Sequence, residues 1–271
     1  LRFHPGEANV RMADAVLVNK VDSASSEQLA TVTANVRAVN PGAAVLLARV
    51  GTIVHGTTVA TNATLTGTGA KSALLTTEGI RDALEMRRGI REEQYNNAYT
   101  NVKPLVPRYL RAGVKGRLDR AGREIAPLDL AGIDAAIAEF RREGVEAVSI
   151  CFMNSYANPA HEAAAAERVR AAMPDAFLTV SSTLLPSIRF YERVSTTALN
   201  SYVGPKLNRY VEQLVSRLAS AGFRGTLLIM QSNGGVMAPE VARSSPALTL
   251  LSGPAGGPGA GLFYAKALGV D

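Results

Sequence analysis

HGTTVATN, the stretch from His55 to Asn62, constrains the fold of this 271-residue chain more than any other single segment. It follows the apolar pair Ile53–Val54, which predicts a strand, and it opens a stretch that predicts a helix over residues 59–66. Glycine admits backbone angles that other residues avoid, and the free N–H groups of a helix N-terminus bind anions. The segment therefore indicates either a well-capped helix start or a loop that lines a ligand site.

Two further glycine-rich segments follow later, MQSNGG at Met230–Gly235 and SGPAGG at Ser252–Gly257. Each comes after an apolar run that predicts a strand, over residues 227–230 and 247–251 respectively. The glycines of SGPAGG are expected to lead into a final helix that ends near residue 268. Chain reversal alone explains any one such turn, but two of them, each after a strand, favour contact with a ligand.

The rest of the chain alternates between strand and helix patterns, which predicts the α/β class. Residues 92–130 are the exception, because they are rich in Asn, Pro, Arg and Gly and predict an extended insertion with a hairpin around residues 120–122. The expected strands cover residues 15–18, 43–47, 72–76, 147–153 and 177–181. The first expected helix is capped by Ser23 or Ser25 and runs to about residue 38. Further helices are expected over residues 78–87, 130–143, 159–172 and 196–221, the last with a break at Gly204–Pro205.

Composition excludes several classes of protein. With 47% hydrophobic and 19% charged residues, the chain is an ordinary globular protein, and its net charge of +6 comes from scattered Lys and Arg. No interleaving of basic and aromatic residues indicates nucleic-acid binding. The lone Cys151 excludes a disulfide framework and suits a reducing cytoplasm; it predicts a core residue, with a reactive thiol as the alternative. No apolar stretch is long enough for a membrane span.

The first 49 residues carry a separate signal, the sequence NKVD at Asn19–Asp22, directly after a predicted strand. NKVD matches the guanine-reading motif of P-loop GTPases, but no phosphate-binding G-x-x-x-x-G-K-[ST] occurs in the chain. The flanking LRFHPGEANVRMADAVLVNKVDSA resembles the C-terminal part of the cyclic 2,3-diphosphoglycerate synthetase family. We therefore expect residues 1–49 to be an inert synthetase-like fragment of a P-loop protein, joined near Arg49–Val50. A GTP-linked phosphoglycerate enzyme is the alternative.

Two charged segments lie in the middle of the chain. SYANPAHE at Ser155–Glu162 predicts a strand-to-helix corner, where His161 and Glu162 lack a third ligand at metal-site spacing. LLPSIRFYERVSTTALNSYVGP, residues 184–205, contains a charge cluster that is expected to brace a loop or a subunit interface. The cluster consists of Arg189, Glu192 and Arg193.

Residues 184–205 and the three glycine-rich segments, in this order, resemble the hydantoinase A/5-oxoprolinase family from about residue 50 to residue 271. Phe190 stands where that family commonly has a second Glu. The resemblance implies part of an actin/Hsp70-like (ribonuclease H-like) ATPase architecture with mixed sheets. Residues 50–180 would form the N-terminal-type region and residues 181–271 the start of the main domain.

The resemblance also implies a site for ATP and Mg, although it identifies no metal ligand. His55 is either a catalytic acid–base group or a histidine held by hydrogen bonds. The residues expected to bind the nucleotide are Thr57, Thr58, Asn62, Ser232, Asn233, Gly234, Gly235, Ser252, Gly253, Gly256 and Gly257.

The implied function is a subunit, or a fragment of one, of an ATP-dependent hydrolase that opens a hydantoin-like or oxoproline-like ring by phosphorylating the amide. The alternatives are a ketone carboxylase subunit of the acetone/acetophenone carboxylase type and an inert truncated fusion. A hydantoinase B-like subunit is the implied partner, in a cytoplasmic oligomer that binds neither nucleic acid nor membrane. The family's two D-x-G-G-T-x-T-D phosphate loops do not occur here. This polypeptide alone is therefore expected to have negligible ATPase activity.

Overall fold

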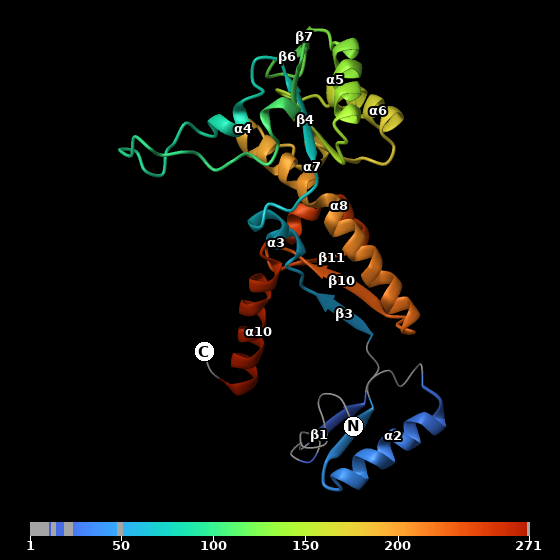
Figure 1. Ribbon diagram of the computed structural model, residues 1–271. Coiled ribbons are helices and arrows are strands. Elements are labelled where there is room, and N and C mark those ends of the chain that lie inside the picture. Colours follow the sequence, from blue (N-terminus) through green and yellow to red (C-terminus); the bar gives the residue numbers. More distant parts are fainter. Residues whose placement is uncertain (1–10, 12–14, 19–23, 48–50, 270–271) are drawn as a thin grey trace. The chain divides into compact units, whose positions relative to one another are not determined.

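The computed structural model describes residues 11, 15–18, 24–47 and 51–269, and these residues divide into two compact units (Figure 1). The first unit comprises residues 1–55 and 212–228, and the second comprises residues 56–211 and 229–271. The NKVD segment, which matches a guanine-reading motif and is expected to be inert here, lies outside the described residues.

The first unit confirms the strand–helix–strand pattern at the start of the chain. β1 (Ala15–Val18) and β2 (Ala44–Leu47) pair in parallel, and α2 (Ser26–Val39) connects them. Ser25 caps this helix: its hydroxyl accepts a hydrogen bond from the Gln28 N–H at 3.2 Å, and the Gln28 side chain accepts one from the Ser25 N–H at 2.9 Å. This reciprocal capping box sets the start of the helix.

A sheet of four parallel strands forms the centre of the second unit, in the order β5-β4-β8-β9. The strands are β4 (Ser72–Thr77), β5 (Arg111–Val114), β8 (Ala147–Cys151) and β9 (Phe177–Val180). Every residue of β4 and β8 is buried, as expected for central strands that are covered on both faces. α5 (Leu130–Arg142) and α6 (Ala160–Ala172) pack on each other and on these strands.

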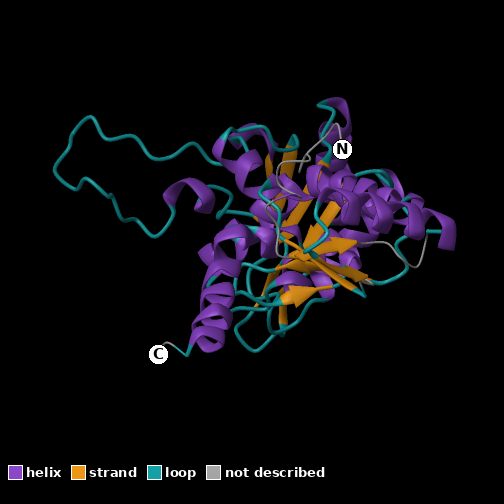
Figure 2. Ribbon diagram, turned by 90° about the horizontal axis from the view of Figure 1, so that it is seen from below, coloured by secondary structure: helices purple, strands orange, loops and turns teal. Residues whose placement is uncertain are grey.

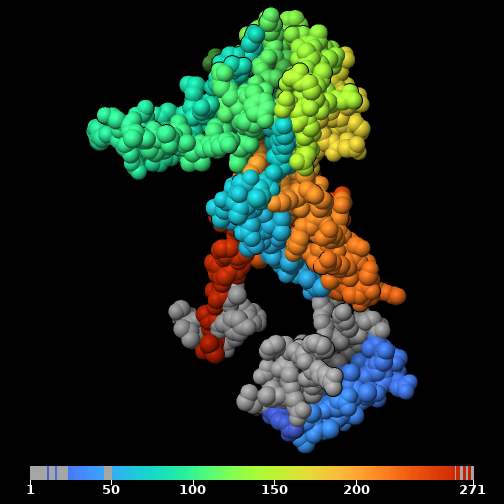
Figure 3. Space-filling view, viewed as in Figure 1, coloured from blue at the N-terminus to red at the C-terminus, as the bar shows by residue number. Residues whose placement is uncertain are grey.

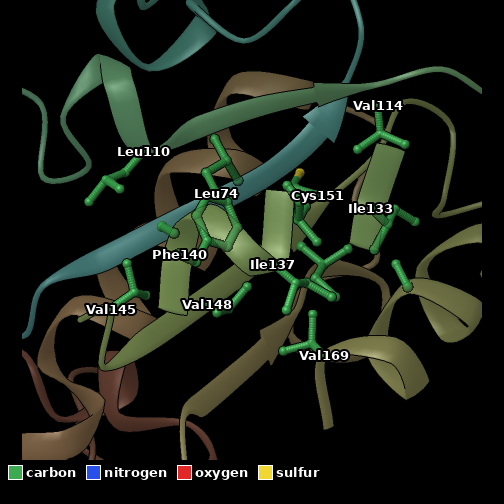
Figure 4. Packing of buried hydrophobic residues seen from close by; sticks show 14 of the residues in the cluster. Leu74, Leu110, Val114, Ile133, Ile137, Phe140, Val145, Val148, Cys151 and Val169 are labelled. Atoms are coloured by element: carbon green, nitrogen blue, oxygen red, sulfur yellow. The ribbon is translucent and has the colours of Figure 1, made fainter. Parts of the chain in front are cut away.

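The main core lies between this sheet and its helices (Figure 4). Ile133, Ile137 and Phe140 recur along α5 with helical spacing, so one face of the helix is apolar and buried. Cys151 is fully buried in the same cluster, and burial raises the pKa of its thiol to about 12. The predicted core role of this cysteine is confirmed, because a thiol with such a pKa is not ionised near neutral pH.

α8 (Phe190–Ser220) is one continuous helix of 31 residues, so the predicted break at Gly204–Pro205 and the predicted start near residue 196 are both wrong. Gly204 serves close packing: a Cβ there would lie 2.5 Å from the Phe177 ring. Pro205 removes one helical hydrogen bond. Buried residues on both sides, among them Val203 and Leu207, hold the helix together across it.

Residues 78–130 depart from the sequence-based interpretation in two ways. A single turn, α4 (Ala83–Met86), replaces the helix expected over residues 78–87. Gly79 has a φ of +87°, which a right-handed helix does not allow, so the expected helix cannot include this residue. The expected insertion also contains β5, which belongs to the main sheet, and the 3₁₀ helix η1 (Arg108–Leu110). The hairpin is confirmed as β6 (Arg117–Leu118) and β7 (Glu124–Ala126), paired antiparallel.

The last part of the chain contains a second sheet, in the order β11-β10-β3. β10 (Thr226–Met230) and β11 (Val236–Met237) are antiparallel, whereas β3 (Thr52–His55) comes from far earlier in the sequence. With the parallel main sheet, this hairpin confirms an α/β fold with mixed sheets. No helix among the described residues is long and apolar enough to cross a membrane.

Two predictions near the C-terminus are wrong. Residues 247–251 were expected to be a strand, but a 3₁₀ helix, η2 (Pro246–Thr249), occupies this place after α9 (Pro239–Ser244). α10 (Ser252–Leu268) begins at Ser252, so SGPAGG forms the first turns of the helix rather than a loop before it. Proline is compatible with a first helical turn, since the N–H groups there have no helical partner.

Candidate functional site

The HGTT segment passes from β3 directly into α3 (Val59–Leu65). Thr57 is buried, and its hydroxyl accepts a hydrogen bond from the Val59 N–H at 3.3 Å. Thr58 and Asn62 are exposed, and the Asn62 amide donates to the Thr58 hydroxyl at 3.3 Å. The first turn of α3 therefore presents a hydroxyl and an amide to solvent, while Thr57 stabilises the turn from inside.

SGPAGG lies against this turn, although the two segments are far apart in sequence. The fully buried Ser252 hydroxyl donates to the Thr57 carbonyl at 3.1 Å and faces the Thr57 N–H at 3.4 Å. The Leu251 N–H donates to the Thr61 hydroxyl at 3.0 Å. A Cβ on Gly56 would lie 3.7 Å from the Gly253 Cα, so the two backbones run close together. We call the Thr57–Ser252 and Thr61–Leu251 contacts the clasp.

MQSNGG forms the hairpin turn between β10 and β11. The Gln231 N–H donates to the Gly235 carbonyl at 2.8 Å, and the Gly235 N–H donates to the Asn233 side-chain oxygen at 2.9 Å. Gly234 has a φ of +82°, which explains the glycine at that position. The Ser232 hydroxyl donates to the Leu248 carbonyl at 2.8 Å, which ties the turn to η2.

This turn also approaches the start of α10. A Cβ on Gly256 would lie 2.9 Å from the Met230 sulfur, and one on Gly234 would lie 3.4 Å from the Ala255 carbonyl oxygen. All three glycine-rich segments therefore meet around the first turns of α10. Figure 1 shows α3, α10 and the β10–β11 hairpin converging there.

The residues predicted to bind a nucleotide fall into two groups. Thr57 and Ser252 are both buried: the Ser252 hydroxyl bonds to the Thr57 backbone, and the Thr57 hydroxyl bonds to the Val59 N–H, so both side chains are engaged within the protein. The others are exposed or partly exposed and stay candidates for ligand contact: Thr58, Asn62, Ser232, Asn233, Gly234, Gly235, Gly253, Gly256 and Gly257.

Leu251 is a feature of the site that the sequence did not indicate. It precedes α10 with a φ of +55°, a left-handed conformation that is uncommon for residues other than glycine. An apolar run gives no signal of such a corner, and the same run led to the wrong strand prediction. Its conformation turns the chain so that Ser252 enters the clasp.

His55 is the last residue of β3 and directly precedes Gly56. Its side chain is partly buried, and this burial lowers the pKa of the imidazole below its usual value of 6.5. The ring is therefore neutral at pH 7, which is the form able to accept a proton. The catalytic role expected for His55 stays a prediction.

A buried ion pair lies outside this cluster, at the carboxyl ends of β8 and β9. Glu162 and Arg193 are both fully buried, with 3.7 Å between a carboxylate oxygen and a guanidinium nitrogen. Glu162 also accepts hydrogen bonds from the Ser181 hydroxyl at 2.6 Å and the Ser182 N–H at 2.7 Å. Arg193 donates to the Phe152 carbonyl at 2.8 Å. These partners compensate both charges, which identifies the pair as part of the core.

The neighbouring charged residues also have partners of their own. His161 lies 2.7 Å from a Glu124 carboxylate oxygen, and Glu192 pairs with Arg88. Within the described part of the chain, no three His, Cys, Asp or Glu side chains gather to hold a metal ion. His161 and Glu162 are thus engaged structurally, in agreement with the sequence-based interpretation.

Comparison with protein families identifies the chain. The model of the hydantoinase/oxoprolinase N-terminal region matches residues 9–173, and that of hydantoinase/oxoprolinase matches residues 193–270. The chain belongs to the hydantoinase/oxoprolinase family. The first match runs across the predicted junction at Arg49–Val50. The synthetase-like origin of residues 1–49 and the domain boundaries stay predictions.

Known relatives of this hydantoinase/oxoprolinase chain include cyclic-amide hydrolases and ketone carboxylases. Caprolactamase subunit alpha of Pseudomonas jessenii is 41% identical over 220 residues, 80% of this chain and 32% of that subunit. 5-Oxoprolinase 1 of Arabidopsis thaliana is 31% identical over 144 residues, 53% of this chain and 11% of that protein.

Two solved structures share the fold. The crystal structure of the ATP-dependent caprolactamase from Pseudomonas jessenii aligns with a TM-score of 0.74 over 83% of this chain and 32% of that chain, at 41% identity. A nucleotide-free acetone carboxylase structure aligns with a TM-score of 0.72 over 82% of this chain and 32% of that chain, at 25% identity. The chain thus spans about a third of the length of these relatives, with shares of 32% in both.

Proposed function

We propose that this chain is part of a subunit that uses ATP to open a cyclic amide. The observation that carries the proposal is the 41% identity to the caprolactamase subunit over 80% of the chain. The carboxylase subunits of the family are more distant, at 28% for acetophenone carboxylase gamma and 26% for acetone carboxylase beta. The meeting of the three glycine-rich segments supplies a place where a nucleotide would lie.

The arrangement around α10 fits a role in holding ATP. Thr58, Asn62 and Asn233 carry exposed hydroxyl and amide groups in the segments that meet near the start of α10, where helical N–H groups favour negative charge. The clasp joins α3 to the start of α10 through contacts that do not use these groups. The D-x-G-G-T-x-T-D phosphate loops of the family do not occur among these 271 residues. We therefore propose that the rest of the subunit supplies these loops and binds the Mg that accompanies ATP.

In the proposed reaction the amide oxygen attacks the γ-phosphorus of ATP, and the bond from that phosphorus to ADP breaks. The phosphorylated amide is a far better electrophile than the amide itself, so water adds to its carbon. The C–N bond then breaks, the nitrogen leaves as an amine, and an acyl phosphate remains. A second water releases phosphate and the carboxylate. Donors positioned around the transferred phosphoryl group would lower the barrier of the first step.

Ketone carboxylation is the second candidate function. The TM-score of 0.72 to acetone carboxylase supports it, because the same fold serves that reaction. In that case a ketone and bicarbonate replace the cyclic amide as substrates. A catalytically inert fusion, the third possibility raised by the sequence, would turn over neither.

We further propose that the subunit works with a hydantoinase B-like partner in a cytoplasmic oligomer. The relatives named as caprolactamase subunit alpha, acetophenone carboxylase gamma subunit and acetone carboxylase beta subunit are all components of larger enzymes. These names support the proposal that the present chain also works together with a second subunit.

A substrate screen tests the proposal. The full-length subunit is expressed with its hydantoinase B-like partner, and ADP release is measured with Mg and ATP in the presence of caprolactam, hydantoin, 5-oxoproline, or acetone with bicarbonate. We expect stimulation by at least one cyclic amide and none by acetone. Asn62→Ala should raise the KM for ATP, whereas Gln213→Ala, an exposed position on α8, should not. Stimulation by acetone alone would favour the carboxylase, and no stimulation would favour the inert fusion.

A further inference from the structure

The long helix α8 carries polar side chains in its buried part. Its residues Tyr202 and Val203 pack on α3, and Figure 3 shows α3 in cyan beside α8 in orange. Three polar side chains of the same stretch are completely buried: Thr197, Asn200 and Ser201. Burying a polar group costs free energy unless the group is hydrogen-bonded, so the partners of these side chains show what each of them holds in place.

Two of the three side chains bond within α8 or to the main sheet. The Thr197 hydroxyl donates to the Arg193 carbonyl at 2.6 Å, one helical turn earlier. The Ser201 hydroxyl lies 3.2 Å from the Val148 carbonyl oxygen on β8 and 2.8 Å from the Thr179 hydroxyl on β9. The Ser201 contacts therefore fasten α8 to the two strands beneath it.

The Asn200 side chain, in contrast, has partners in two parts of the fold. Its amide nitrogen donates to the Thr179 hydroxyl on β9 at 3.1 Å and to the Ser244 carbonyl at the end of α9 at 3.3 Å. Its amide oxygen accepts a hydrogen bond from the Ala247 N–H in η2 at 3.0 Å. Both amide protons and the oxygen are used, which fixes the orientation of the amide. Asn200 thus joins the main sheet to the connection between α9 and η2.

η2 in turn lies where the three glycine-rich segments meet. Its Leu248 carbonyl accepts hydrogen bonds from both the N–H and the hydroxyl of Ser232 in MQSNGG, each at 2.8 Å. η2 also contacts α3, the helix that HGTTVATN opens. Directly after η2, Leu251 and Ser252 enter the clasp, and α10 begins there. In Figure 2, α10 is the helix that leads to the C-terminal label.

We propose that Asn200 is a positioning residue of the nucleotide site. This inference rests on the proposed function, which supplies the nucleotide. Asn200 is completely buried and bonded within the protein, so it acts through η2 rather than by touching ATP. By fixing η2 on the main sheet, it holds the MQSNGG turn and the start of α10 in place before ATP arrives. Such preorganisation reduces the entropy that binding would otherwise lose.

Hydrogen exchange in the full-length subunit tests the structural step without nucleotide. Asn200→Ala removes the acceptor of the Ala247 N–H and the donor to the Ser244 carbonyl. Ser201→Ala is the matched control, because it removes a neighbouring buried hydroxyl that bonds only toward β8 and β9. Amides of β8 report any general loss of stability in both variants, and circular dichroism verifies folding.

The Ser232 N–H is the most informative probe, because it donates directly to η2. Relative to the β8 amides, its exchange should be at least about fivefold faster in Asn200→Ala than in Ser201→Ala, since buried hydrogen bonds that hold η2 are lost. Equal exchange at Ser232 in the two variants would overturn the proposal.

Steady-state kinetics test the functional step, in the complex of the full-length subunit with its hydantoinase B-like partner. A residue that only supports the fold changes the amount of active enzyme, which lowers the apparent kcat and leaves the KM for ATP unchanged. Asn200→Ala should instead raise the KM for ATP about 5- to 50-fold and change kcat by less than about threefold. Ser201→Ala should leave this KM unchanged. A wild-type KM in Asn200→Ala would contradict the positioning role.

The wild-type subunit provides a measurement that does not depend on the folding of any variant. Because the Ala247 N–H donates to the buried Asn200, its exchange should be about as slow as that of the Ser232 N–H. A non-hydrolysable ATP analogue should slow both amides together. An Ala247 amide that exchanges like an unprotected one, or that stays unaffected while the analogue slows Ser232, would overturn the proposal.

The two proposals can fail separately. If Asn200→Ala accelerates exchange at Ser232 but the wild-type complex opens no cyclic amide, the proposed function fails and the hold of Asn200 on the MQSNGG turn stands. If ring opening is normal in the wild type and Asn200→Ala changes neither the KM for ATP nor the exchange at Ser232, the positioning role fails and the function stands.

Discussion

Ser252→Ala removes the hydroxyl at the centre of the clasp. In the wild-type chain this hydroxyl donates to the Thr57 carbonyl at 3.1 Å and lies 3.4 Å from the Thr57 N–H. Ser252 is fully buried and Thr57 is 5% exposed, so water does not readily replace the lost group. The 3.4 Å contact is long and contributes little. The loss is therefore that of one buried hydrogen bond, about 1–3 kcal/mol.

Hydrogen exchange measures this loss locally. Amides of α3 should exchange about 5- to 140-fold faster in Ser252→Ala, since each 1.4 kcal/mol corresponds to about tenfold in an opening equilibrium. Ser232→Ala is the matched control: Ser232 is exposed, and its backbone N–H still donates to the Leu248 carbonyl at 2.8 Å. Its effect on α3 should be within about 0.5 kcal/mol. Equal exchange in the two variants would refute the view that Ser252 holds the motifs together.

The remaining predictions concern packing, buried charge, pH and activity. Gly204→Ala should destabilise the fold by about 1–3 kcal/mol in chemical denaturation, because the new Cβ would lie 2.5 Å from the Phe177 ring; an unchanged midpoint would argue against that close packing. Glu162→Gln should cost about 3–5 kcal/mol, since it leaves Arg193 buried without its counter-charge; a loss below 1 kcal/mol would show that the pair is dispensable. Glu92, whose pKa is lowered to about 2 from 4.5, should brace the loop of residues 88–103 above pH 4.5 and release it only as the pH falls through about 2, so NMR spectra of this loop should match at pH 7 and pH 5. This chain alone should release phosphate from ATP only at background rate, because it lacks both phosphate loops; measurable turnover would contradict that assignment.

Much of the fold could be predicted because buried strands and buried helix faces require apolar residues in characteristic patterns along the sequence. β4 contains the apolar run Ala73–Leu75, β8 is apolar except for Ser149, and α5 shows apolar residues at helical spacing. The three glycine-rich segments could likewise be recognised, since small residues are required where backbones approach closely. Gly256 is one place where a side chain would not fit, since a Cβ there would lie 2.9 Å from the Met230 sulfur.

Features that depend on distant partners could not be predicted. The helix α8 continues through Gly204–Pro205 because packing outweighs the local preference of these residues to end a helix. β5 was missed because it is a short strand that contains Arg111, whose charge is neutralised by Glu85 at 3.1 Å after folding. Local propensity carries no information on such pairings.

The same reason limits what the sequence shows about the site. Thr57 and Ser252 look like ligand-binding hydroxyls in their motifs, but in the folded chain the Ser252 hydroxyl donates to the Thr57 carbonyl and the Thr57 hydroxyl accepts from the Val59 N–H. The Glu162–Arg193 pair joins two segments that look like unrelated charge clusters in the sequence. Only the three-dimensional contacts separate residues that support the site from those that stay exposed in it.

Hydrogen exchange with a non-hydrolysable ATP analogue tests most directly the proposal that three segments distant in sequence form one nucleotide site. The measurement uses the full-length subunit with Mg, with and without the analogue. We predict slower exchange in residues 56–62, 231–235 and 252–257 together, and no change in the β6–β7 hairpin. Protection confined to other parts of the subunit, with these three segments unaffected, would contradict it.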